Sequence, residues 1–162
     1  MEPHTKNENA IHRARYRWTE DFKGNWAASE LKAAVETILA AHQLLGSLRE
    51  GAHFHARIES GTLLPLIISK HDRQITVGQY FMQDCDTYAD PAMDLEIGKD
   101  GAWYPISVEL ADGNCRQCVD GPLQIDLEER RKQVSFAAKW AADLLAQGYE
   151  RREVSQLWGE ND

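Results

Sequence analysis

The chain has 162 residues, of which 43% are hydrophobic, and this is enough to bury the core of one domain. Its formal net charge of −8 argues against sequence-independent binding of nucleic acid over most of the surface, because like charges repel. We expect a cytoplasmic protein without a membrane span or secretory signal: no apolar run approaches ~20 residues, and three cysteines fit a reducing compartment.

Residues 1–25 are expected to form a partly flexible arm. The arm contains the stretch Arg13-Ala-Arg15-Tyr-Arg17-Trp18, in which cations alternate with aromatic rings. Such a pattern can clamp a nucleic-acid strand, but it is equally typical of an edge strand or a solvated arm. Residues 26–48 carry apolar side chains at helical spacing, which predicts an amphipathic helix. Asn25 is its candidate N-cap, and Gly46 or Gly51 is expected to end it.

After this helix the hydrophobic period changes to two, which is typical of half-buried strands. The predicted strands are 53–60, 64–69, 74–82, 93–97, 103–110 and 115–119. A second helix is expected to begin after Asp126, with Glu129 at capping-box distance, and to end at Gly148. Residues 149–162 are expected to be a charged tail with a short amphipathic turn.

Short connections between strands predict antiparallel neighbours. The predicted fold is therefore α+β: one domain over residues 26–148, with an antiparallel sheet of about six strands in a meander. The N-terminal and C-terminal helices each have one apolar stripe and are expected to pack on the same face of the sheet. The other face is expected to carry His53, His55, Arg57, Glu59, Trp103, Ser107 and Glu109.

The strands, read in order, resemble an uncharacterised family of small proteins or domains carried on bacterial plasmids, integrative elements and phages. The resemblance covers roughly residues 53–109. Its most specific parts are the strand from Phe54 to Glu59, Asp86, Asp90-Pro91, Met93 and Trp103-Tyr104-Pro105. The chain departs from the family at Gln79, where a histidine is usual, and at Ala92, where a glutamate is usual. The family has no established activity, so the resemblance implies only an accessory protein of a mobile element.

The segment Q-D-C-D-T-Y-A-D-P-A-M-D, residues 83–94, concentrates four aspartates and Cys85. Clustered carboxylates suit hard cations. The calcium-loop order fails, however, because Ala89 stands where glycine is required and Leu95 where a bidentate glutamate is required. We therefore expect a connection between strands in which Asp90-Pro91 sets the turn.

A metal site remains an alternative. His53 and His55 lie two apart on a predicted strand, so both rings share a face and can bind one transition metal. Carboxylates of the acidic segment would complete a site made of His53, His55, Asp86 and Asp90. Cys115 and Cys118 have C-x-x-C spacing, but on a strand they point to opposite faces, and we expect ordinary reduced thiols.

Two functions are compatible with these residues. The favoured one is a non-catalytic acidic protein without a cofactor, which binds another protein and inhibits a host defence or a nucleic-acid-handling protein. Its expected binding face contains His55, Glu59, Asp86, Asp90 and Trp103, because exposed aromatic side chains are typical interface anchors. The alternative is a metal-assisted hydrolase or nuclease built on the His/Asp cluster. A homodimer is compatible with either function.

Overall fold

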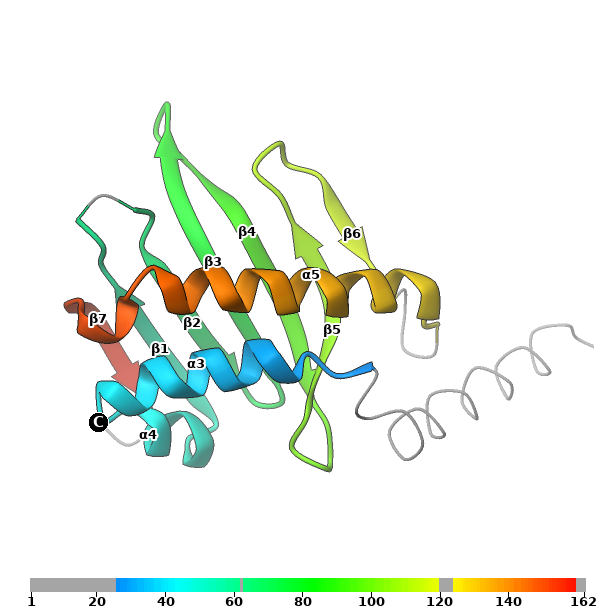
Figure 1. The fold of residues 1–162 in the computed structure, drawn as a ribbon, viewed down its shortest axis with the longest axis horizontal. Coiled ribbons are helices and arrows are strands. Elements are labelled where there is room, and N and C mark those ends of the chain that lie inside the picture. The colour runs from blue at the N-terminus through cyan, green and yellow to red at the C-terminus, as the bar shows by residue number, and fades with distance from the viewer. Residues whose placement is uncertain (1–25, 62, 120–123, 160–162) are drawn as a thin grey trace, which may run out of the picture.

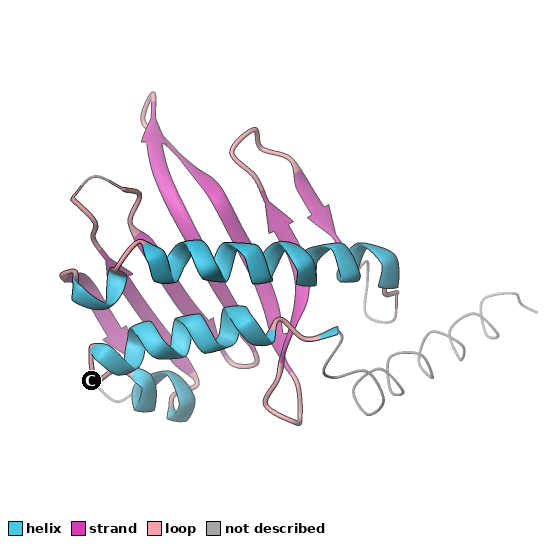
Figure 2. Ribbon diagram, in the orientation of Figure 1, coloured by secondary structure: helices cyan, strands magenta, loops and turns pink. Residues whose placement is uncertain are grey.

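In the computed structural model, which describes residues 26–61, 63–119 and 124–159, helices cover one face of a single antiparallel sheet (Figures 1 and 2). Within these residues the sheet has seven strands in the order β6-β5-β4-β3-β2-β1-β7. The strands are β1 (His53–Ile58), β2 (Leu66–His71), β3 (Gln74–Gln83), β4 (Asp86–Ile97), β5 (Trp103–Glu109), β6 (Cys115–Gln117) and β7 (Val154–Gly159). The α+β class is confirmed, and β1 to β6 form the expected meander.

The seventh strand lies where a charged tail with an amphipathic turn was predicted. After a short 3-10 helix η1 (Tyr149–Arg151), β7 pairs antiparallel with β1 and becomes one edge of the sheet. Most of its side chains are exposed, including Leu157 and Trp158. An edge strand with so little burial has no alternating hydrophobic pattern, and this is why the sequence did not reveal it.

The predicted helix 26–48 is two helices, α3 (Ser29–Ala41) and α4 (Leu45–Glu50). Gln43 has a φ of 61°, and the amides of Gln43 and Leu44 donate to the carbonyls of Ala40 and Leu39. This is a Schellman ending in which glutamine occupies the left-handed position that glycine usually takes. Gly51 follows the last residue of α4. Asn25, the basic stretch and the rest of the N-terminal arm lie outside the described residues.

The second predicted helix is confirmed as α5 (Leu127–Ala146). The Asp126 side chain accepts a hydrogen bond from the Glu129 amide at 3.0 Å, and Gly148 follows the helix with a φ of 75°. Figure 1 shows α3 and α5 side by side across the same face of the sheet. The core lies between them and the strands, and its fully buried members include Leu31, Val35, Ile38, Phe54, Ile58, Ile68, Val77, Met93 and Leu144. No helix of the described segments is long and apolar enough to cross a membrane.

One polar side chain, Gln79 of β3, is buried on the helix side of the sheet with an exposed fraction of 6%. Its carbonyl accepts from the Trp140 ring nitrogen at 2.9 Å. Its amide donates to Gln147 Oε1 and to the Tyr149 hydroxyl, both at 2.7 Å, and that hydroxyl donates in turn to the Leu64 carbonyl. Gln79 therefore connects the C-terminal end of α5 and the start of η1 to the middle of the sheet through hydrogen bonds.

The buried hydrogen bonds of Gln79 lead to a prediction about stability. Gln79→Leu should lower the free energy of unfolding by about 1–3 kcal/mol, because the buried Trp140 N–H loses its acceptor. The measurement is urea unfolding followed by Trp fluorescence. The matched control is Gln83→Leu on the same strand, where the side chain is exposed and little change is expected. Equal stability of the Gln79→Leu variant and the wild type would contradict this role.

Candidate functional site

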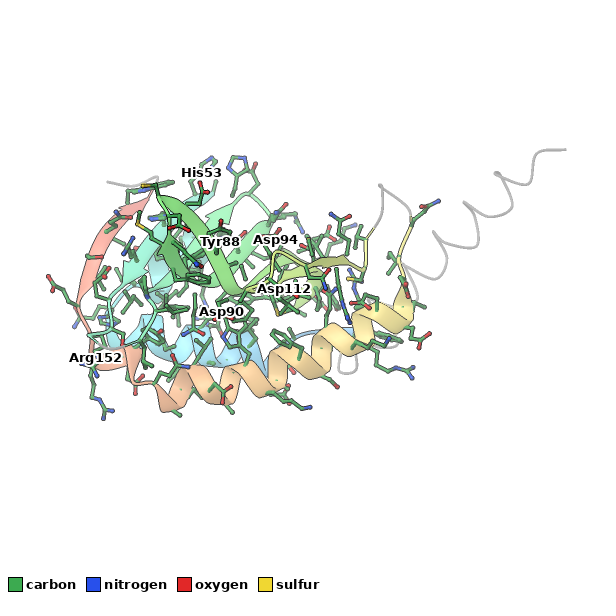
Figure 3. All side chains as sticks on the ribbon, turned by 90° about the horizontal axis from the view of Figure 1, so that it is seen from above. His53, Tyr88, Asp90, Asp94, Asp112 and Arg152 are labelled. Carbon is green, nitrogen blue, oxygen red and sulfur yellow. The ribbon has the colours of Figure 1, made fainter. Side chains whose placement is uncertain are left out.

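The face of the sheet turned away from the helices, here called the open face, is polar. On β1, His53, His55 and Arg57 point to this face and alternate with the buried Phe54, Ala56 and Ile58, as predicted. Figure 3 shows His53 on the side of the sheet opposite the helices. Cross-strand register continues a row of side chains through Trp158, His55, Ser69, Thr76, Asp94 and Ser107. The open face is thus an ordered array of polar groups across six strands.

His55 is held on three sides within this row. Its Nδ1 is hydrogen-bonded to Ser69 Oγ at 2.9 Å, and its Nε2 to Gln156 Oε1 at 3.2 Å. The ring stacks on Trp158, with centroids 5.1 Å apart and planes 8° from parallel. Both ring nitrogens of His55 therefore make contacts within the protein. Through these contacts His55 links β1 to β2 and to the edge strand β7.

Asp94 is the central carboxylate of the open face. Thr76 donates to Asp94 Oδ1 at 2.6 Å, and Ser107 donates to Oδ2 at 3.3 Å, so hydroxyl groups fix both oxygens. The Tyr80 ring lies over Gly78, where an added Cβ would stand 2.6 Å from a ring carbon. Burial, together with the charges of Asp94 and Glu109, raises the pKa of Tyr80. Asp94 lies on the predicted strand 93–97, but its partners come from strands whose register the sequence does not reveal.

Trp103 was expected on the open face and is instead in the core, with an exposed fraction of 3%. The prediction was wrong because β5 contains a bulge. Pro105 is opposite Leu95 and Ser107 is opposite Asp94, which leaves Ile106 as an extra residue. A bulge reverses the alternation, so Trp103 lies on the helix side while Ser107 lies on the open face. Trp103 therefore cannot anchor a partner.

The acidic segment is a strand and a tight turn rather than a loop. The turn of the β3–β4 hairpin consists of Asp84 and Cys85, whose φ values are 54° and 70°. Asp90 and Pro91, expected to set a turn, lie inside β4, where together they oppose the single residue Gln79. A proline cannot donate to the sheet, and a bulge is one of the few interior positions that tolerate it. Of the four aspartates, Asp84 is therefore in the turn, and the other three are spread along β4.

The tip of the β3–β4 hairpin, residues 81–90, extends past the neighbouring strands (Figure 1). Met82 is 75% exposed, and Tyr88, which stacks on Phe81 with ring centroids 5.5 Å apart, is 37% exposed. The register places Met82 and the Phe81–Tyr88 pair on opposite faces of the hairpin. Asp84, Asp86 and Asp90 are exposed, and this segment contains no lysine, arginine or histidine. The hairpin tip thus combines exposed apolar groups with uniform negative charge.

The structure does not bring together the four residues of the metal hypothesis. His53 and His55 lie on β1, whereas Asp86 and Asp90 lie on β4, with β2 and β3 between them. Three strand spacings amount to roughly 14 Å, far beyond the span of one metal ion. Among the described residues, no group of three or more His, Cys, Asp or Glu side chains is arranged to hold a metal. Cys115 is exposed and Cys118 is buried, so these thiols do not converge either.

Glu59, the last residue of the expected binding face, is engaged within the protein. Its Oε2 accepts from Arg57 Nε at 2.6 Å and from the Ser155 hydroxyl. These hydrogen bonds, that of Arg57 first, lower the pKa of Glu59. Like His55, Glu59 links β1 to the segment that forms β7. The sequence missed both contacts because it gave no sign of that strand.

Comparison with known proteins identifies the family to which the chain belongs. A family model described as a domain of unknown function, DUF6908, matches residues 34–150. The match supports the resemblance to an uncharacterised family, and it reaches from residue 34, within α3, to residue 150, within η1, beyond the residues 53–109 that first suggested it. No curated protein and no solved structure matches the chain.

The Arg57–Glu59 pair gives a pH-dependent prediction. Because the folded-state pKa of Glu59 lies below its ordinary value of 4.5, the pair stabilises the fold above that pH. The stabilisation disappears as the pH falls through the lowered pKa. In Arg57→Met the pKa of Glu59 should rise towards the ordinary value, and in Ser155→Ala it should rise less. Carboxyl NMR titration measures both, and an unchanged pKa in Arg57→Met would contradict the assignment.

Proposed function

The chain belongs to the DUF6908 family, whose domain has no assigned function, and we propose that it is a non-catalytic interaction protein that binds another protein through its hairpin tip. The observation that carries the proposal is the exposure of Met82 and Tyr88 on a hairpin that projects beyond the sheet. Methionine and aromatic side chains are enriched at the cores of protein interfaces. Because they lie on both faces of the hairpin, they suit insertion into a groove that contacts it from two sides.

The charge of the hairpin tip indicates the kind of groove. Three exposed aspartates in a segment that contains no lysine, arginine or histidine favour a positively charged partner surface and speed the encounter with it. Proteins that handle nucleic acids have such surfaces, because they must bind phosphates. The partner we propose is therefore a nucleic-acid-handling protein, with the hairpin in the place of the polyanion. For an accessory protein of a bacterial mobile element, the target would be a host defence or processing enzyme.

This proposal changes the residues of the expected binding face. Asp86 and Asp90 remain, because both are exposed on the hairpin. Met82 and Tyr88 replace Trp103 as the apolar anchors, since Trp103 is buried. His55 and Glu59 hold the β1–β7 edge and contribute to binding only through the fold. The charged groups would orient the hairpin, and the apolar groups would supply most of the affinity.

The proposal predicts a loss of binding in a double variant. Met82→Ser with Tyr88→Ser should reduce recovery of the partner on the order of tenfold or more, which is the loss expected for interface anchors. The measurement is affinity capture from a bacterial lysate with quantitative mass spectrometry. The matched control is Leu145→Ser with Asp143→Asn on α5, because Leu145 is 43% exposed and Asp143 is also exposed. All four side chains reach solvent, so the unfolding midpoints of both variants should stay near that of the wild type.

The role of charge is tested on the same partner. Asp86→Asn with Asp90→Asn should weaken binding and flatten its dependence on salt, and a DNA duplex should compete with the wild-type hairpin for the partner. Equal recovery by the wild type and the Met82/Tyr88 variant would remove the hairpin as the binding element. Loss of recovery in the α5 control would place the interface on the helix side instead.

A further inference from the structure

His53 faces His71 across the β1–β2 ladder. The two residues are directly opposite in the antiparallel register, where side chains on one face approach more closely than residues two apart on a strand. Their Nδ1 atoms are 2.8 Å apart, and their ring centroids are 4.5 Å apart with planes tilted by 47°. The sequence suggested His55 as the metal-binding partner of His53, but in the structure the histidine in contact with His53 is His71 on the neighbouring strand.

The separation of the two nitrogens is close to what a metal ion requires. Imidazole nitrogens bind zinc at roughly 2.0–2.1 Å, so two of them at right angles around one ion are roughly 2.9 Å apart. A tetrahedral angle widens this separation to roughly 3.4 Å. Small rotations of the two rings would therefore convert the contact between nitrogens into two adjacent coordination positions.

The carboxylate of Asp72 favours the tautomer of His71 in which Nδ1 is free of a proton and can bind a metal. Asp72 Oδ2 lies 3.6 Å from Nε2, the ring nitrogen that faces away from His53. A carboxylate beside Nε2 favours the proton on that nitrogen and leaves the lone pair on Nδ1. Histidine ligands of metals commonly donate this second N–H to a carboxylate, and Asp72 is near Nε2 but at an ion-pair distance rather than a hydrogen-bond distance. The backbone of Asp72 forms the tight β2–β3 turn with a φ of 55°, and its side chain is 69% exposed.

The site is open to solvent. The two rings border a depression of about 240 Å³, lined also by Phe54, Ser69, Lys70, Gln74, Thr76 and Trp158. This volume leaves room for water molecules to fill the remaining coordination positions. His55, although near, is held by Ser69, Gln156 and Trp158 and is not free to turn towards the pair.

We propose that His53 and His71 form a two-histidine site for a divalent transition-metal ion such as Zn²⁺, with water completing its coordination. Imidazole nitrogen suits zinc, copper and nickel, whereas Mg²⁺ and Ca²⁺ require oxygen ligands and would not be held. With two protein ligands the affinity is modest, and bound metal ties β1 to β2. The proposal is independent of the hairpin tip, which lies at the far end of β3 and β4.

The test is calorimetric titration of the full chain with Zn²⁺. Exposed thiols also bind zinc, so all variants carry Cys85→Ser and Cys115→Ser. The background protein should bind one Zn²⁺ per chain at this site. His53→Gln and His71→Gln should each weaken binding at least tenfold. His55→Gln is the matched control on the same strand and face, and it should bind as the background does.

Two further readouts decide the outcome. Binding should weaken in acidic solution, because protons compete with the metal ion for the imidazole nitrogens. Ring-proton NMR signals of His53 and His71 should shift at one equivalent of Zn²⁺, while those of His55 stay in place. The proposal is overturned if the background protein binds no Zn²⁺, or if binding survives either the His53→Gln or the His71→Gln substitution. Binding of Mg²⁺ at the same site would also contradict it.

Discussion

The structure depends on one constraint: α3 and α5 bury the same face of the sheet. Apolar side chains of the central strands must then point to the helices, and the alternation of a strand sends polar side chains to the other face. The arrangement tolerates a polar group on the covered face only where its hydrogen bonds are met. Gln79 satisfies this condition through Trp140, Gln147 and Tyr149. The covered face is therefore structural, and the candidate functional groups lie on the open face and beyond the sheet.

Two bulges decide which side chains reach the surface. Asp90-Pro91 opposes Gln79, and a bulge of this kind increases local twist and bends the strand that carries it. The hairpin tip begins directly beyond this point, clear of both helices. The second bulge, at Ile106, moves Trp103 into the core and leaves Ser107 to hold Asp94. Gln79 is buried and hydrogen-bonded on the helix side, and Ala92, its neighbour on β4 across the bulge, is buried opposite Gly78.

Much of the fold could be predicted from local patterns. Asp126, Glu129 and Gly148 marked both ends of α5, and alternation located β1, β2, β3 and β5. The failures have physical reasons. Gln43 takes a backbone conformation that usually signals glycine, and β7 buries too little to show a period. The site depended on register: the His53–His71 pair, the Asp94 cluster and the burial of Trp103 all follow from contacts between strands, which no local pattern encodes. Asp86 and Asp90 were identified as surface carboxylates, but their place on a projecting hairpin was not.

The central claim is that the hairpin tip, rather than the helices, meets the partner. Hydroxyl-radical footprinting of the free protein and of the captured complex tests it most directly, because methionine reacts readily and the chain contains an internal reference. Met82 is 75% exposed and Met93 is buried, so in the free protein Met82 should be oxidised and Met93 should not. In the complex, Met82 and Tyr88 should become protected while Leu145 of α5 stays reactive. Continued oxidation of Met82 in the complex, with protection of α5, would contradict the account.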